Sequence, residues 1–223
     1  MNQEQALSLL KETKLVAILR GIPVKQATDI ATALYDGGVR VLEFTFDHDD
    51  PDCVAHNCQR IRAVKKIFGD EMVVGCGTAL TVQEVEASVE AGGQIVISPN
   101  VDVSVIAKTK ALGAISMPGA LTPTEIVMAY NAGADIVKLF PAGTLGVPYI
   151  KAVRGPLGYI PMSAVGGVRP ETIADFLNVG VCGFGVGGEL VKKEFVRSGD
   201  MNALTSRARK FVHAIEQWEA NRP

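Results

Sequence analysis

Short apolar runs alternate with longer amphipathic segments along the whole chain. The amphipathic segments carry the three-to-four-residue apolar period of helices with one buried face, and many of them end at a glycine-bearing turn. An apolar run follows each turn, as expected for a buried strand after a helix C-terminus. The pattern predicts eight strands, within residues 14–21, 35–46, 71–78, 89–100, 110–120, 130–143, 160–168 and 177–190.

Helix-start signals support the same alternation. The segments "LTVQE", "LTPTE" and "VRPE" have the capping or first-turn residues that begin a helix. Eight strand–helix alternations in about 200 residues match the size of a small (β/α)8 barrel. A doubly wound open sheet is the alternative, but it usually has a glycine-rich turn after its first strand, and "ILRGIPVKQA" has one glycine. The pattern favours an α/β (β/α)8 TIM barrel, as a single domain over residues 1–223.

Two ionisable residues lie inside apolar runs, where a barrel would bury them. Lys138 lies in "DIVKLFPAG" and Glu43 lies in "RVLEFTF". Burial lowers the pKa of a lysine and leaves an amine that can attack a ketone. A lysine that reaches solvent from the strand end, or that pairs with a carboxylate, fits the local sequence equally well. Glu43 is in turn either a proton shuttle or the ion-pair partner of Lys138.

Glycine pairs end the seventh and eighth expected strands. They are Gly166-Gly167 and Gly187-Gly188. In many barrels the loops at these two positions bind phosphate through backbone N–H groups. Glycines at strand ends also serve tight turns alone. The joint position of both pairs favours an anion site.

Composition narrows the class of partner. With 21% charged residues and a net charge of -2, the chain has no basic footprint for nucleic acid or an anionic membrane. Its apolar runs are far shorter than the roughly 18 residues of a membrane span, and the N-terminus does not resemble a secretory signal. The four cysteines form no CxxC pair and are expected to be reduced. We expect a cytoplasmic protein that acts on a small molecule.

These motifs together resemble a known family. "LVAILRG", "LEFTF", "GCGTALT", "ISPN", "MPGALTPTEI", "VKLFPAG", "AVGGV" and "GVGGEL" are similar to segments of the 2-keto-3-deoxy-6-phosphogluconate / 4-hydroxy-2-oxoglutarate aldolase family. The resemblance covers nearly the whole chain. It implies a class I aldolase on a (β/α)8 barrel, a homotrimer that needs no metal or other cofactor, and cleavage of a 2-keto acid to pyruvate and an aldehyde.

The resemblance also assigns roles to individual residues. Lys138 corresponds to the Schiff-base nucleophile, and Glu43 to the general acid/base. Thr78 corresponds to the hydroxyl that holds the pyruvyl carboxylate. The remaining matches are the pocket arginine (Arg20), two residues that wall the pocket (Pro99 and Phe140) and the loops that receive the distal phosphate (Gly166, Gly167, Gly187 and Gly188).

Three positions depart from the family pattern. Asp47 stands where an arginine commonly helps to hold the substrate carboxylate, so a forked cation has become an anion. Glu189 stands where many relatives have a phosphate-binding serine, and it would repel a phosphate. Val165 replaces a threonine. We therefore expect Arg20 to take over the carboxylate, or a different substrate end to be recognised. The distal end is a hydroxyl, a carboxylate or the family's phosphate.

The segment "DHDDPDCVAHNC" raises the question of a metal site, because it contains His48, His56, Cys53 and Cys58 among carboxylates. It has no His-x-His or Cys-x-x-Cys ligand spacing. Acidic residues at a helix start are ordinary capping chemistry. We expect no functional metal, with Asp50 as N-cap and Pro51 as first helical position.

Three functions remain open from the residues. The first is a Schiff-base lyase that uses Lys138 and Glu43. The second is a barrel isomerase or epimerase on a sugar phosphate, with Glu43 as the base and Lys138 as its electrostatic partner. The third is a non-catalytic barrel that binds a small molecule. The presence of both the lysine and the glutamate argues against the third function.

Overall fold

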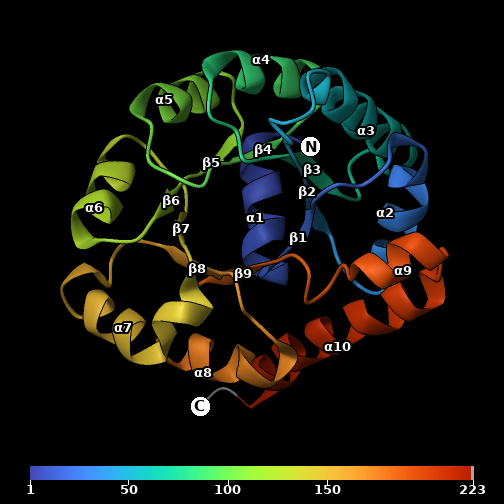
Figure 1. Cartoon of the computed structure of the whole chain (residues 1–223). Helices are drawn as coiled ribbons and strands as arrows, with labels where there is room; N and C mark the ends of the chain where they lie inside the picture. Colours follow the sequence, from blue (N-terminus) through green and yellow to red (C-terminus); the bar gives the residue numbers. More distant parts are fainter. Residues whose placement is uncertain (222–223) are drawn as a thin grey trace.

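The computed structural model describes residues 1–221, and residues 222 and 223 of the expected 1–223 domain lie outside the described residues. Parallel strands form an inner ring and helices surround it (Figure 1). The strands are β1 (Leu15–Leu19), β2 (Val41–Thr45), β3 (Val73–Gly77), β4 (Ile95–Ile97), β5 (Ile115–Met117), β6 (Gly119–Ala120), β7 (Val137–Leu139), β8 (Met162–Val165) and β9 (Gly183–Val186). The helices are α1 (Gln3–Thr13), α2 (Ala27–Asp36), α3 (Cys53–Phe68), α4 (Val82–Glu90), α5 (Val103–Ala111), α6 (Pro123–Asn131), α7 (Ala142–Leu157), α8 (Ile173–Asn178), α9 (Lys193–Ser198) and α10 (Met201–Ala220).

Strand pairing confirms the barrel prediction. Neighbours follow chain order from β1 to β5 and from β6 to β9, and β1 pairs with β9. β5 pairs with β4, whereas β6 pairs with β7, and only Pro118 separates β5 from β6. The fifth expected strand is therefore present as two short parts, which join the two sides of the barrel. The sequential order of the strands excludes the doubly wound sheet.

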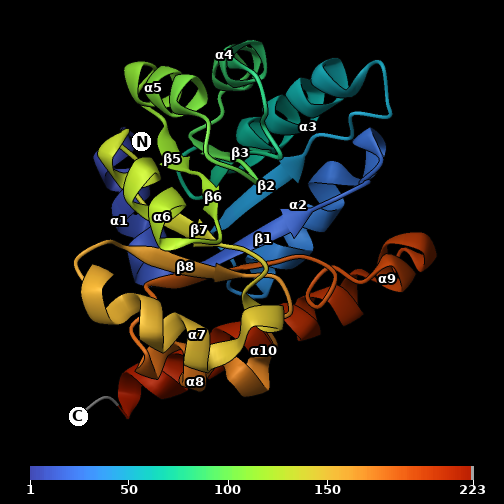
Figure 2. The same cartoon turned by 60° about the vertical axis from the view of Figure 1, so that its left-hand side comes forward.

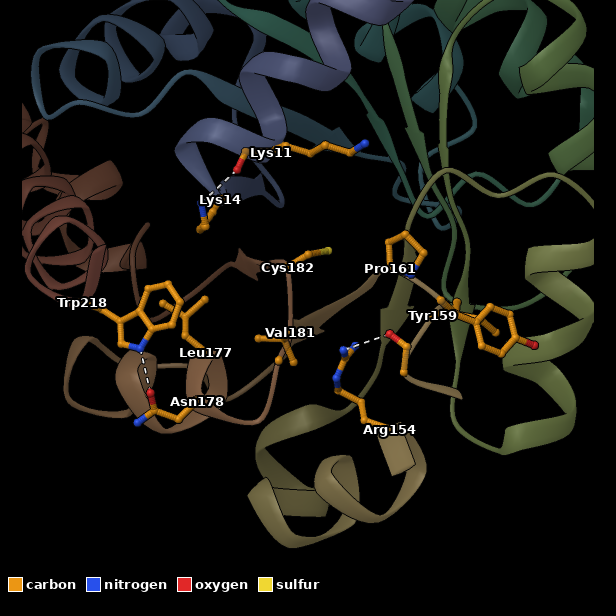
Figure 3. A pocket seen from close by; sticks show the side chains of 13 residues that line it. Lys11, Lys14, Arg154, Tyr159, Pro161, Leu177, Asn178, Val181, Cys182 and Trp218 are labelled. Atoms are coloured by element: carbon orange, nitrogen blue, oxygen red, sulfur yellow. Dashed lines mark hydrogen bonds between the residues drawn. The ribbon is translucent and has the colours of Figure 1, made fainter. Parts of the chain in front are cut away.

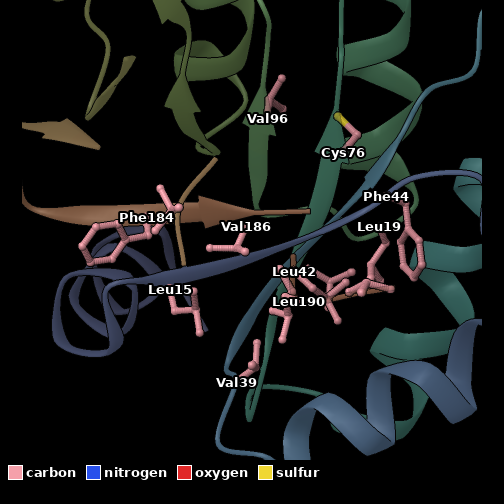
Figure 4. Packing of buried hydrophobic residues seen from close by; sticks show 14 of the residues in the cluster. Leu15, Leu19, Val39, Leu42, Phe44, Cys76, Val96, Phe184, Val186 and Leu190 are labelled. Atoms are coloured by element: carbon pink, nitrogen blue, oxygen red, sulfur yellow. The ribbon is translucent and has the colours of Figure 1, made fainter. Parts of the chain in front are cut away.

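Side chains of each strand alternate between two cores. Leu42 and Phe44 of β2 pack outward against the helices, in the cluster shown in Figure 4. Val41 of the same strand belongs to the inner cluster, where Ala6 and Leu10 of α1 also pack. Helix α1 lies across the N-terminal end of the barrel (Figures 1 and 2). Apolar side chains of α1 thus pack against the inner core from this end.

Two of the expected helix starts are capping boxes. Thr81 caps α4 with Glu84, and Thr122 caps α6 with Glu125, each through reciprocal side-chain and backbone hydrogen bonds. The expected start at Asp50 and Pro51 is wrong, because α3 begins at Cys53. Asp50 instead stabilises the turn before the helix: its Oδ1 accepts from the N–H of Asp52 at 3.0 Å.

His48, in the loop after β2, and His56, in α3, are each paired with a carboxylate. His56 Nδ1 lies 2.7 Å from Asp50 Oδ2, and His48 Nε2 lies 2.8 Å from Glu84 Oε1. Within residues 1–221 no group of three or more histidine, cysteine, aspartate or glutamate side chains is arranged to hold a metal ion. The four cysteines are free thiols. No described helix has the length and apolar character that crossing a membrane requires.

Candidate active site

One cavity at the C-terminal end of the strands collects the residues singled out from the sequence. Its volume is about 210 Å³. It is lined by Arg20, Glu43, Thr78, Pro99, Lys138, Phe140, Gly166, Gly167, Gly187 and Gly188, together with Ile18 and Val165. These residues come from seven strands or the loops after them, so only the closed barrel brings them together.

Lys138 faces the barrel interior because of its place in β7. Val137 and Leu139 on either side belong to the outer core, and strand alternation directs the residue between them inward. The side chain is buried, and burial lowers the pKa of its ammonium group; Glu43 opposes this effect and Arg20 adds to it. Nζ lies 5.1 Å from the centre of the Phe140 ring. Burial in the barrel thus makes the ammonium group of Lys138 easier to deprotonate than that of an exposed lysine.

Glu43 lies between Leu42 and Phe44 and also points inward. It is 2% exposed, and burial raises the pKa of its carboxyl group to about 7, against the opposing effects of Lys138 and Arg20. Its Oε2 atom is buried and has no hydrogen-bond partner within the described part of the chain. A carboxyl group with a pKa near neutrality both accepts and donates a proton at physiological pH.

The backbone at Thr78 is strained. Its φ angle is 57°, in the left-handed region that β-branched residues rarely occupy. A conformation of this kind costs on the order of 1–3 kcal/mol and persists only where the surroundings impose it. Thr78 directly follows β3 and lines the cavity, so the strain lies at the candidate site.

The two glycine pairs differ in what they require. Gly166 and Gly167 have φ angles of 89° and 72°, and a Cβ atom on Gly167 would lie 3.1 Å from the Cα atom of Gly143. This turn therefore needs glycine for both its conformation and its packing. Gly188 has an ordinary φ angle, and nothing lies within 4 Å of its ideal Cβ position. Conformation alone does not explain that glycine.

Comparison with known proteins places the chain in a family. The family model for KDPG and KHG aldolase matches residues 7–207. The chain belongs to this aldolase family. It is 37% identical over 182 residues to a probable 2-dehydro-3-deoxy-6-phosphogalactonate aldolase of Rhizobium meliloti strain 1021, covering 81% of this chain and 83% of the relative.

Two further members of the aldolase family resemble nearly the whole chain. The KHG/KDPG aldolase of Escherichia coli K12 is 32% identical over 216 residues, which are 95% of this chain and 96% of that protein. A solved structure described as native KDPGal superimposes with a TM-score of 0.83 at 32% identity, covering 92% of this chain and 96% of that chain. The barrel described above is therefore the fold of this aldolase family.

The structure changes the interpretation of Glu189. This residue does not line the cavity in this member of the aldolase family. Its carbonyl oxygen accepts from Nε of Arg207 at 2.8 Å, and its carboxylate lies 3.4 Å from Nη2 of the same arginine. The repulsion of a substrate phosphate by Glu189 stays a prediction, and the contact of its carboxylate with Arg207 of α10 partly offsets its charge.

Asp47 also lies outside the Lys138 cavity. It lines a neighbouring cavity of about 380 Å³ at the rim of the barrel, together with Arg20, Lys193 and Arg197. Arg20 lines both cavities. Three cations therefore face one carboxylate in this rim cavity, and an anion is favoured there.

Two residues that line the Lys138 cavity were not predicted as site residues. Ile18 was not singled out from the sequence, and Val165 was noted only as a departure from the family pattern. Ile18 is in β1, two residues before Arg20, so strand alternation places both on the inner side. Val165 ends β8 and, as an apolar side chain, offers no hydrogen bond to a substrate hydroxyl. Alternation alone was a signal for Ile18, but an isoleucine is equally a packing residue.

A larger cavity, of about 680 Å³, lies at the N-terminal end of the barrel and contains none of the predicted site residues (Figure 3). Its basic side chains already have partners or lie beside a helix end. Lys14 Nζ lies 2.6 Å from Glu219 Oε1, and Arg154 donates to the carbonyl of Gly158 at 3.1 Å. Lys11 is in the last turn of α1, where a cation complements the helix dipole. These contacts give the cations of this cavity a structural role.

Proposed function

We propose that this protein is a class I aldolase that cleaves a 2-keto-3-deoxy-6-phospho sugar acid to pyruvate and a phosphorylated aldehyde through a Schiff base on Lys138. One observation carries the proposal: a buried lysine and a buried glutamate line the same cavity of a barrel that belongs to the aldolase family. Burial shifts the pKa values of both groups towards neutrality.

Schiff-base formation needs an unprotonated amine and a proton carrier. The amine of Lys138 attacks the C2 carbonyl carbon, and the carbonyl oxygen takes a proton to give a carbinolamine. Glu43 then supplies the proton with which the hydroxyl leaves as water, so that the protonated imine remains. A carboxyl group whose pKa is about 7 is suited to both directions of this transfer.

Cleavage uses the same two groups. The iminium accepts the electron pair of the C3–C4 bond and becomes an enamine. The ionised carboxylate of Glu43 removes the C4 hydroxyl proton, and the aldehyde forms as the bond breaks. Protonation of the enamine at C3 and hydrolysis of the imine release pyruvate and return Lys138 to its amine. One lysine and one glutamate therefore serve the whole cycle.

The substrate's two charged ends need separate partners. We assign the pyruvyl carboxylate to Thr78 and Arg20, which both line the cavity while Asp47 does not. We assign the distal phosphate to the turns at Gly166-Gly167 and Gly187-Gly188, beside the three cations of the rim cavity. The contact between Glu189 and Arg207, and the absence of Glu189 from the cavity lining, support this assignment.

The names of the relatives support a phosphorylated acid and guide the choice of epimer. The 37% identical Rhizobium meliloti relative is named for the 6-phosphogalactonate acid, and the 32% identical Escherichia coli relative for KHG and KDPG. We propose the galactonate epimer as the preferred substrate. A homotrimeric assembly and a cytoplasmic location are further parts of the proposal, and light scattering of the purified protein tests the first.

Pyruvate release from a panel of 2-keto acids tests the proposal. The panel comprises both 6-phosphorylated epimers, their unphosphorylated analogues and 4-hydroxy-2-oxoglutarate. We expect the highest kcat/KM for the phosphorylated galactonate epimer. Equal rates with and without phosphate would contradict the distal assignment. No pyruvate from any acid would contradict the aldolase itself and favour the isomerase or ligand-binding alternatives.

A further inference from the structure

Strand β3 has glycine at two positions that alternation directs into the barrel. It runs from Val73, an inner-core residue, through Gly75 to Gly77. Glycine in a strand interior weakens the strand, and it often marks a place where another group approaches closely. The groups that lie next to Gly75 and Gly77 therefore show why each position lacks a side chain.

The carboxyl group of Glu43 lies closest to the position that a side chain on Gly77 would occupy. A Cβ atom built on Gly77 would lie 1.5 Å from Oε2, 2.2 Å from Cδ and 2.7 Å from Oε1 of that glutamate. These are the three nearest heavy atoms. The carboxyl group thus occupies the space that any side chain at position 77 would fill. At Gly75 the nearest atom is the backbone oxygen of Ile95, at 1.9 Å, so that glycine serves strand packing.

Strand register shows how far the glutamate reaches. The Cα partner of Glu43 in β3 is Gly75, whereas Gly77 lies opposite Thr45. The carboxyl group therefore points from the level of Gly75 towards the next inward position of β3, which is Gly77. This direction leads towards the C-terminal end of the barrel, where Thr78 follows Gly77 and the Lys138 cavity opens.

We infer that Gly77 is a positioning residue for Glu43: its missing side chain forms the seat that holds the carboxyl group at the mouth of the Lys138 cavity. The steric part of this inference rests on the contacts above. Its catalytic consequence rests on the proposed aldolase function. A methyl group at position 77 displaces the carboxyl group and leaves Lys138, the glycine turns and Arg20 in place.

A stability cycle tests the seat without reference to activity. We compare the urea midpoints of the wild type, Gly77→Ala, Glu43→Ala and the double variant. Gly77→Ala is expected to lower the midpoint clearly in the wild type and much less in the Glu43→Ala background, because the clashing carboxyl group is then absent. Gly155→Ala is the matched control, since nothing lies within 4 Å of its Cβ position. Additive effects of the two substitutions would overturn the inference.

Kinetics test the catalytic consequence. Gly77→Ala is expected to lower kcat by about 10²-fold or more, the scale of a lost general acid/base, with a smaller change in KM. Glu43→Asp, whose carboxyl group is one methylene shorter, is expected to recover part of that kcat in the Gly77→Ala background. A purely structural role for Gly77 predicts an unchanged kcat at the temperature where the variant is folded, and that result would overturn the inference.

The two tests separate this inference from the proposed function. If the wild type releases no pyruvate, the aldolase proposal fails while the stability cycle still reports on the seat. If the wild type is active and the cycle is additive, the seat fails and the aldolase stands.

Discussion

Replacement of Glu43 by glutamine is expected to stabilise the protein at alkaline pH while it removes the proton carrier. Burial raises the pKa of Glu43 from its ordinary 4.5 to about 7. The folded state therefore holds this proton more tightly than the unfolded state, and wild-type stability falls as the pH rises from about 4.5 to about 7. At about 1.4 kcal/mol for each pKa unit, the loss is about 3 kcal/mol. Glutamine does not ionise and does not incur this loss.

Urea unfolding at a series of pH values measures the effect. We expect the free energy of unfolding of Glu43→Gln minus that of the wild type to be about 3 kcal/mol larger at pH 8 than at pH 4.5, so that the variant gains relative stability as the pH rises. Protein concentration is held constant so that any change in assembly does not contribute. Glu171→Gln, an exposed glutamate outside the cavity, is the matched control. Parallel pH profiles for the wild type and Glu43→Gln would refute the burial argument.

Four further substitutions separate the ends of the site. Arg20→Gln is expected to raise KM for a phosphorylated 2-keto acid at least tenfold with a smaller change in kcat, and an unchanged KM would remove Arg20 from substrate binding. Gly167→Ala is expected to lower the free energy of unfolding by about 1–2 kcal/mol, because the φ angle of Gly167 is 72°. Gly188→Ala is expected to change the free energy of unfolding by no more than about 0.5 kcal/mol. Equal urea midpoints for the two variants would contradict this prediction. Glu189→Gln is expected to change kcat/KM less than threefold, because its charge is paired with Arg207 outside the cavity; a large gain with phosphate would show that Glu189 faces the substrate.

The order of elements could be predicted from the sequence because it depends on local signals. Glycine turns and apolar runs located each strand, and Thr81 and Thr122 began α4 and α6 as their capping patterns predicted. The division of the fifth strand at Pro118 could not be predicted, because β5 and β6 hydrogen-bond to different neighbours. The start of α3 was wrong for a related reason: Asp50 is bound by His56 and the turn, and a sequence pattern does not distinguish that role from an N-cap.

Some features of the candidate site could likewise be predicted from the sequence, and others could not. Lys138 and Glu43 alternate with outward-facing apolar residues, so their inward direction follows from the strand period. The direction of the Glu189 side chain depends on Arg207, which lies in α10. The strand pattern from which the site was predicted does not include this helix. The need for glycine at position 77 comes from the side chain of Glu43 on the neighbouring strand. Only the strand pairing in the folded barrel brings Gly77 and Glu43 together.

The central claim is that Lys138 forms a covalent imine with a 2-keto acid. Incubation with pyruvate, reduction with borohydride and mass spectrometry of the intact protein and its peptides measure this directly. We predict one reduced pyruvate adduct, located on Lys138, and no adduct in Lys138→Ala. An unmodified Lys138 in the active protein, or the same adduct in Lys138→Ala, would contradict the Schiff-base account.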